Sequence, residues 1–156
     1  MIVYHASPFI IEKPDVNHSR ENLDFGKGFY LTTLHDQAVK YAQRFKLRGK
    51  EAFVNKYELC DDFNFLEVKR FLSYDEEWLD FVSACRRNAD SSTFDIVIGG
   101  IANDKVFRTI DLYFSGDMNK DEALQKLKFE QPNNQLCIRS QNAINKCLKF
   151  LDAEGI

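Results

Sequence analysis

The sequence has no CxxC pair, no HExxH motif and no apolar run approaching the ~20 residues that a membrane span needs. Its three histidines stand far apart, and none belongs to a cluster with metal-ligand spacing. We therefore expect neither a structural metal site nor a membrane-spanning helix.

The cysteines also lack the spacing of a redox or zinc motif. Polar residues follow the apolar start MIVYH almost at once, so no secretory leader is expected. Together these features predict reduced thiols in a cytoplasmic protein. The cysteines are Cys60, Cys85, Cys137 and Cys147.

Glycine and proline are scarce, with seven glycines and three prolines spread along the chain without repeats, so no linker is expected. A chain of 156 residues, 44% of them hydrophobic, can bury a core of its own, which predicts a single domain over 1–156. The net charge of -3 does not favour a phosphate-backbone footprint. Nucleic acid is therefore neither implied nor excluded as a partner.

Strand and helix patterns are mixed along the chain without the strict βαβ alternation of a doubly wound sheet, which predicts an α+β fold. Segment 12–24 is polar and is expected to be a loop. Strands are expected at 2–5, 29–32, 53–60, 66–71, 94–98 and 135–139. Helices are expected after Thr33, Ser73, Asn103, Asn119 and Ser140, the last running to Leu151.

Three short blocks, far apart in the sequence, carry a joint resemblance to a known family. They are Tyr4-His-Ala-Ser7, then Phe25-Gly-Lys-Gly-Phe-Tyr-Leu-Thr32 with a helix behind it, and Asn134-Gln-Leu-Cys-Ile138. In this order they resemble the catalytic domain of the poly(ADP-ribose) polymerases and the diphtheria-toxin-like branch of ADP-ribosyltransferases. The second block looks very like the family's FGKGIYF run.

The resemblance implies an ADP-ribosyltransferase-like fold, with split antiparallel sheets around an NAD cleft and flanking helices. Residues 50–130 look unlike the polymerases. They resemble instead a bacterial branch of the same superfamily, a domain of unknown function, through Asp95-Ile-Val-Ile-Gly99 and Ala102-Asn-Asp104.

The resemblance also assigns roles around NAD⁺, the co-substrate. His5 would hydrogen-bond the adenosine ribose, Tyr30 and Tyr41 would sandwich the nicotinamide ring, and Gln135 would contact the nicotinamide ribose. Such a pocket suits cleavage of the nicotinamide–ribose bond, because charge develops on the sugar as that bond breaks. The predicted catalytic residues are His5, Tyr30 and Gln135, and the predicted cofactor-binding residues are Ala6, Ser7, Arg20, Gly28 and Tyr41.

Two positions depart from the family. Gln135 stands where the family has a catalytic glutamate, and a neutral amide cannot deprotonate an incoming hydroxyl. Ala38 stands where a serine usually touches the carboxamide, so one hydrogen bond of about 0.5–1.5 kcal/mol is missing. Elongation of poly(ADP-ribose) is therefore not expected, whereas single transfer, slow NAD⁺ cleavage or binding alone all remain open.

Each residue also has an ordinary structural interpretation. His5 could be a strand histidine satisfied by a carbonyl, and Gln135 an exposed strand residue. Glu130, close to Gln135, is a reserve carboxylate that would enter the site if the third block had another register. The remaining residues could serve in core packing (Tyr30 and Tyr41), in a tight turn (Gly26 and Gly28), as solvated charges (Arg20 and Lys27) or as an N-cap (Asn103 and Asp104).

The leading functional hypothesis is a mono-ADP-ribosyltransferase that modifies a protein or nucleic-acid acceptor. By resemblance it would be a bacterial toxin of a toxin–antitoxin pair, held in check by an antitoxin protein. The second hypothesis is a catalytically silent NAD⁺ or ADP-ribose binding module. RNA 2′-phosphotransferase chemistry is disfavoured, because that branch uses a different set of histidines and arginines.

Overall fold

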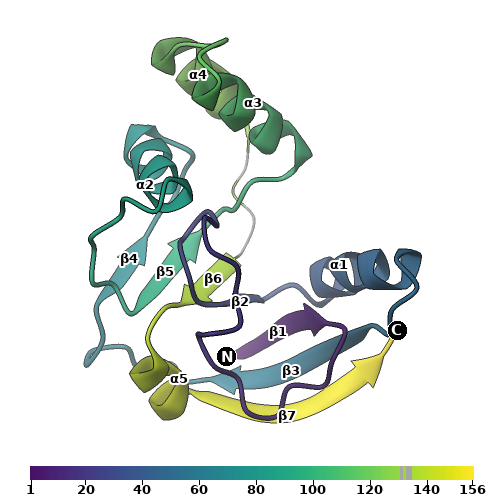
Figure 1. Cartoon of the computed structure of the whole chain (residues 1–156). Helices are drawn as coiled ribbons and strands as arrows, with labels where there is room; N and C mark the ends of the chain where they lie inside the picture. Colours follow the sequence, from purple (N-terminus) through teal and green to yellow (C-terminus); the bar gives the residue numbers. More distant parts are fainter. Residues whose placement is uncertain (131, 133–134) are drawn as a thin grey trace.

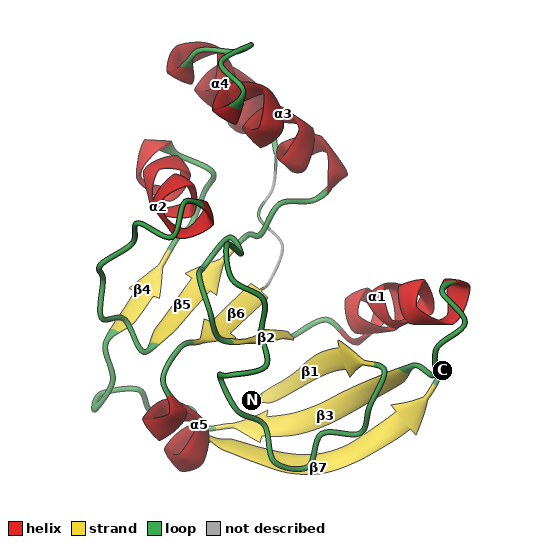
Figure 2. Cartoon of the chain, viewed as in Figure 1, coloured by secondary structure: helices red, strands yellow, loops and turns green. Residues whose placement is uncertain are grey.

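The computed structural model describes residues 1–130, 132 and 135–156 (Figure 1). Strands and helices are mixed along the chain, which confirms the α+β prediction (Figure 2). The strands are β1 (Ile2–Ser7), β2 (Phe29–Thr32), β3 (Phe53–Leu59), β4 (Val68–Arg70), β5 (Ile96–Gly99), β6 (Gln135–Ile138) and β7 (Leu148–Gly155). The helices are α1 (His35–Leu47), α2 (Glu76–Arg86), α3 (Asp104–Phe114), α4 (Lys120–Leu127) and α5 (Gln141–Cys147).

The strands form one sheet in the order β4-β5-β6-β2-β1-β3-β7. Only β4 and β5 run parallel, and every other neighbouring pair of these strands is antiparallel. The pairing between β1 and β2 is the narrowest, because the single pair Tyr4 and Thr32 joins them, whereas β2 pairs with β6 along its whole length. The sheet therefore has two halves that meet at one residue pair.

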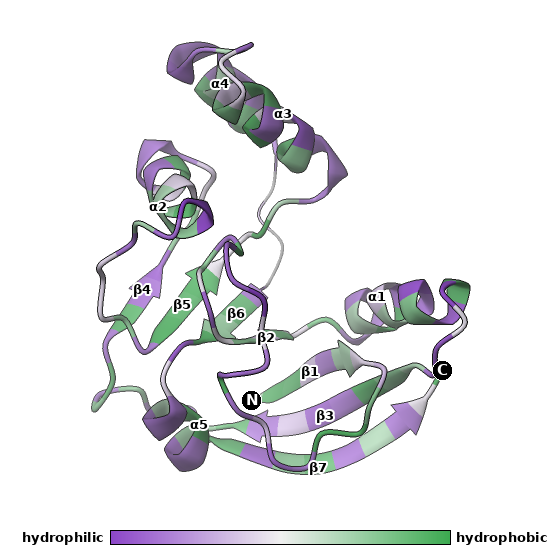
Figure 3. Ribbon diagram, viewed as in Figure 1, coloured by the Kyte–Doolittle hydropathy of each residue, from purple (hydrophilic) through white to green (hydrophobic). Residues whose placement is uncertain are grey.

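Alternation along the strands sends side chains to two different cores. We call the face that packs on α1 and α2 the α1 face, and the face that packs on α5 the α5 face. Val97 and Cys137 join the α2 core on the first, and Ile96 and Ile138 join the α5 core on the second. Because both faces of the central strands are buried, β5 is hydrophobic along most of its length (Figure 3).

Several of the predicted helix starts are confirmed. Asn103, Asn119 and Ser140 each accept a hydrogen bond from the backbone three residues on, as N-caps do. Two predicted caps are wrong. Helix α1 begins at His35 without a side-chain cap, and Asp75, not Ser73, caps α2.

The end of the chain corrects a further prediction. The apolar spacing predicts a helix that runs to Leu151, but α5 ends at Cys147 and β7 follows directly. Strand β7 pairs antiparallel with β3, so its structure comes from a partner strand far away in the sequence. Local periodicity could not reveal that pairing.

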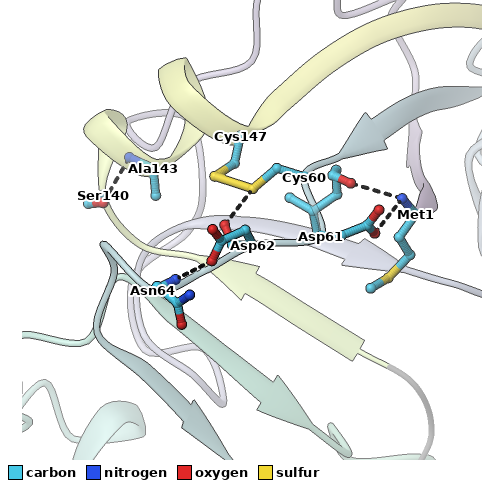
Figure 4. Close-up of a disulfide and its surroundings, with 9 residues drawn as sticks. Met1, Cys60, Asp61, Asp62, Asn64, Ser140, Ala143 and Cys147 are labelled. Atoms are coloured by element: carbon cyan, nitrogen blue, oxygen red, sulfur yellow. Dashed lines mark hydrogen bonds and ion pairs between the residues drawn. A yellow bond between two sulfur atoms is a disulfide. The ribbon is translucent and has the colours of Figure 1, made fainter.

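A disulfide joins Cys60, just after β3, to Cys147, the last residue of α5 (Figure 4). The backbone N–H of Cys60 also donates to the carbonyl of Cys147 at 2.9 Å. The bond corrects the prediction that all four cysteines are reduced, because only Cys85 and Cys137 remain free thiols, and both are buried. The fold brings together two cysteines 87 residues apart, and no spacing rule covers that separation.

Gly28 yields the first testable prediction. A Cβ atom at this position would lie 2.5 Å from Cys137 Sγ and 2.6 Å from the carbonyl oxygen of Ile138. We expect Gly28→Ala to lower the free energy of unfolding by about 1–3 kcal/mol, because β6 cannot withdraw without disturbing two cores. Urea denaturation measures the change, with Gly155→Ala as the control, since its Cβ would meet only Phe53 at 3.9 Å. Equal stability of the two variants would contradict the prediction.

Candidate functional site

The histidine of the first block lies where the sheet divides. His5 Nδ1 is 2.7 Å from the carbonyl oxygen of Tyr30, and its ring stacks on Phe29 with centroids 4.4 Å apart. A carbonyl of β2 thus meets a side chain of β1, not its backbone. The interpretation of His5 as a strand histidine satisfied by a carbonyl is confirmed.

Burial sets the charge of the imidazole, and this hydrogen bond sets which ring nitrogen carries the proton. Burial lowers the pKa of His5, outweighing the bond to the Tyr30 carbonyl, so the ring is neutral near pH 7. Because a carbonyl can only accept, Nδ1 carries the proton and Nε2 keeps its lone pair. Nε2 has no hydrogen-bond partner within the described part of the chain, so His5 can accept a hydrogen bond from a ligand hydroxyl.

The predicted third catalytic residue points in a different direction. Gln135 is the direct cross-strand partner of Thr32 in β2, and Thr32 is the partner of Tyr4 in β1. These three side chains share the α1 face, because directly paired residues point to the same side of a sheet. His5 is adjacent to Tyr4 in β1 and therefore belongs to the α5 face. The strands of the three blocks converge, but His5 and Gln135 do not share a face.

Gln135 is 7% exposed, and its side-chain amide makes no hydrogen bond to any described residue. This corrects the interpretation of Gln135 as an exposed strand residue. Among the described residues, no side-chain nitrogen or oxygen is both fully enclosed and unpaired, so the Gln135 amide still reaches solvent at its tip. An amide with so little access to water and no protein partner is well placed to bind a ligand. Asn134, which opens the third block, lies outside the described residues.

Helix α1 carries an aromatic ring on the flank that contacts Thr32. Ala38 and Ala42 face the sheet, and Gln37 contacts Thr32, so the flank that carries Gln37 is turned toward β2. Tyr41 follows one turn later on that flank and is 51% exposed. Tyr41 is therefore not a core residue. Its ring is supported by Phe45 at 5.8 Å and by the Arg44 guanidinium at 5.2 Å.

Tyr30 shares the α1 face but is committed to the fold. Its hydroxyl donates to the Gly26 carbonyl at 2.6 Å and accepts from the Phe25 backbone N–H at 3.1 Å. Burial raises the pKa of Tyr30 far above its usual value, so the phenol remains protonated. Phe25 is fully buried, and Gly26 has a φ of 77°, a conformation that favours glycine. The FGKGFY block is thus a braced turn as well as a candidate site segment.

Apart from Tyr41, four further residues are predicted to bind the cofactor. Ala6 and Ser7 belong to β1 and pair with β3, and the Ser7 hydroxyl oxygen accepts a hydrogen bond from the backbone N–H of Phe9. The Gly28 N–H donates to Ser19 Oγ at 2.9 Å. Arg20 is exposed and forms no ion pair with any residue that the structure describes. None of these four predicted residues lies in the row of Tyr4, Thr32 and Gln135.

Sequence reasoning missed the polar residues that organise this region. Thr32 Oγ1 donates to Gln37 Oε1 at 2.7 Å and accepts from the Leu34 N–H at 3.1 Å. Asp24, directly before the second block, binds Arg86 of α2 at 2.6 Å and the Ala102 N–H at 2.9 Å. Strand alternation from Tyr30 could have placed Thr32 on the same face, but no local pattern predicts the ion pair of Asp24.

Further candidate features lie away from this row. A surface hollow of about 420 Å³ adjoins Lys46, Lys50 and Ile156, and a second of about 360 Å³ adjoins Tyr74, Leu127 and the reserve carboxylate Glu130. Across the described residues, no cluster of His, Cys, Asp and Glu side chains could hold a metal ion. In the same part of the chain, no helix has the length and apolar character to cross a bilayer.

Fold and site together define an α+β protein whose seven-stranded sheet divides between β1 and β2. Beside this division lies the nearly buried amide of Gln135, which bonds to no residue that the structure describes. The chain belongs to the family described as a protein of unknown function (DUF3990), whose model matches residues 1–150. Neither the curated proteins nor the solved structures contain a match to this chain.

The protonation state of His5 generates the second prediction. Because the pKa of His5 is lowered in the folded state, this residue binds more protons in the unfolded chain below pH ~6.5, and its contribution to stability falls as the pH falls. In His5→Asn, the amide can still donate to the Tyr30 carbonyl but does not titrate. We expect this variant to be about 1–3 kcal/mol less stable than the wild type at pH 8, since the stack on Phe29 is lost. The difference in unfolding free energy between the two proteins should narrow toward pH 5.

Urea unfolding of both proteins at several pH values tests this expectation. The comparison cancels the contribution of His35, whose pKa is raised by Glu154 and which therefore acts in the opposite direction. His18→Asn controls for the loss of an exposed histidine. A gap between wild type and His5→Asn that stays constant with pH would show that His5 does not titrate differently on folding.

Proposed function

We propose that this protein binds NAD⁺ where its sheet divides and acts as a mono-ADP-ribosyltransferase. The observation that carries the proposal is the nearly buried amide of Gln135, which has no hydrogen-bond partner among the described residues. The family resemblance places at this position the residue that contacts the nicotinamide ribose. A sugar hydroxyl both donates and accepts hydrogen bonds, as the side-chain amide does. Binding of ribose would satisfy the groups that folding leaves unpaired.

One further group on the same face supports the assignment. The exposed ring of Tyr41, on the flank of α1 that faces β2, offers a platform for a flat aromatic group such as nicotinamide. His5 Nε2 also lacks a hydrogen-bond partner among the described residues, but it lies on the α5 face, away from Tyr41 and Gln135.

The chemistry available at this site is limited. No carboxylate lies in the row of Tyr4, Thr32 and Gln135, so the row offers no general base for activating a sugar hydroxyl. Glycosidic cleavage can still proceed when the leaving nicotinamide is stacked and the oxocarbenium-like sugar is held by neutral hydrogen bonds. A single slow transfer to a protein or nucleic-acid acceptor suits such a site better than chain elongation.

One observation favours a second candidate, a silent NAD⁺ or ADP-ribose binding module. Tyr30, the one predicted catalytic residue with a hydroxyl, uses that group to hold the Phe25–Gly26 turn.

Incubation with NAD⁺ labelled in the adenylate part, followed by separation of macromolecules from small products, distinguishes the candidates. Label on a macromolecule supports the transferase, saturable binding without turnover supports the module, and absence of NAD⁺ binding overturns both.

The third prediction concerns Tyr41. We expect Tyr41→Ala to weaken NAD⁺ binding by about 1–3 kcal/mol, since a base-like ring loses an aromatic platform. The fold should be retained, because half of this side chain is already exposed. Calorimetry measures the affinity, and Phe65→Ala is a matched control, because Phe65 is 52% exposed and has Lys146 over its ring at 5.4 Å. Equal affinity of both variants would exclude Tyr41 from the site.

The fourth prediction concerns Gln135. Gln135→Glu should preserve the fold and raise the rate of nicotinamide release about tenfold or more, because negative charge near the sugar stabilises the transition state and about 1.36 kcal/mol corresponds to tenfold. Gln135→Ala should lower turnover more than affinity. Gln125→Glu adds the same charge at an exposed position of α4 and should change nothing. Wild-type release rates in both Gln135 variants would remove this residue from the mechanism.

A further inference from the structure

The α1 face holds a second amide beside Gln135, in Gln37 of α1. Thr32 Oγ1 donates to Gln37 Oε1 at 2.7 Å. The same hydroxyl accepts from the Leu34 N–H at 3.1 Å, so both functions of the threonine are engaged. This pair fixes the orientation of the Gln37 amide and leaves its two N–H donors directed away from Thr32.

The placement of the two amides follows from strand register. Thr32 is the direct cross-strand partner of Gln135, and its hydroxyl reaches across to Gln37. The two glutamine side chains therefore flank one threonine, one from β6 and the other from α1. Neither the Gln37 N–H groups nor the Gln135 amide has a hydrogen-bond partner in the described ranges, and Gln135 is more than nine-tenths buried.

We propose that Gln37 is a second ligand-contacting residue of the site, donating from Nε2 to a hydroxyl oxygen of the same ribose that Gln135 contacts. This inference rests on the proposed function and adds a specificity-determining residue to it. Vicinal hydroxyls of a ribose present two neighbouring oxygens, which two neighbouring amides can bind together. Thr32 is a positioning residue, because it orients the Gln37 amide without touching the sugar.

Gln37 also bridges the gap between Gln135 and Tyr41. Tyr41 lies one helical turn beyond Gln37 on the same flank of α1. A nicotinamide ring on Tyr41 would place its attached sugar toward Gln37 and Thr32. The order Tyr41, Gln37, Thr32, Gln135 therefore matches the order of ring and ribose in a nicotinamide riboside.

The fifth prediction tests this arrangement with calorimetry of NAD⁺, ADP-ribose and free nicotinamide. Gln37→Leu should bind NAD⁺ and ADP-ribose about 3- to 10-fold more weakly, the range expected for one hydrogen bond between neutral groups. Affinity for free nicotinamide, which has no ribose, should not change. Gln43→Leu is the matched control, because Gln43 is exposed on the same helix. A loss confined to nicotinamide, or no loss at all, would overturn the assignment to ribose.

A double-mutant cycle separates positioning from packing. Thr32→Val should weaken NAD⁺ binding about as much as Gln37→Leu, and the double variant should bind no more weakly than Gln37→Leu alone. Thr32→Ser retains the hydroxyl and should bind like the wild type, even if its unfolding free energy changes. Additive losses, or failure of serine to restore affinity, would show that Thr32 acts only through the fold.

If the wild-type protein does not bind NAD⁺, the proposed function fails and this inference falls with it. If the wild-type protein binds NAD⁺ and the Gln37→Leu variant binds it equally well, this inference alone is overturned.

Discussion

The hydrogen bond between His5 and the Tyr30 carbonyl is the constraint on which the centre of this molecule depends. A carbonyl in a sheet needs a donor, and here an imidazole supplies one in place of the neighbouring backbone. Strands β1 and β2 therefore pair at one position only and then separate. On the other side of Tyr30, the phenol holds the turn that contains Gly26, so a single residue joins the division of the sheet to the glycine-rich block.

Around Thr32, the α1 face of this division presents neutral polar groups, whereas the ion pair of His35 with Glu154 lies beside Tyr4. Thr32 and the two glutamines beside it offer hydroxyl and amide groups, and Gln135 is buried. The ion pair Asp24–Arg86 joins the residue before the glycine-rich block to α2. The ion pair Arg139–Asp90 joins the residue after β6 to the segment that follows α2. Binding beside Thr32 would thus depend on shape and neutral hydrogen bonds, which give selectivity more readily than large rate accelerations.

Much of the fold follows from short-range signals in the sequence. The strands at Ile2, Phe29 and Gln135 are predictable close to their true starts, because β-branched and aromatic residues between turn signals favour extended backbone. The caps at Asn103, Asn119 and Ser140 are also predictable, since a short polar side chain can satisfy a free helical N–H locally. The candidate site is less predictable from the sequence than the fold. The resemblance singles out Gln135, but its burial and the contacts of Thr32 and Gln37 depend on which strands become neighbours.

The sequence by itself determined the local preferences: where most strands and helices begin, the freedom to turn at Gly26 and Gly28, and the alternation of side chains along each strand. Only the tertiary structure decided that residues after Cys147 form β7, that Cys60 and Cys147 meet, and that His5 and Gln135 point to opposite faces. The physical reason is the range of the interactions. Backbone sterics and capping act over a few residues, whereas strand register and burial require partners that are distant in the chain.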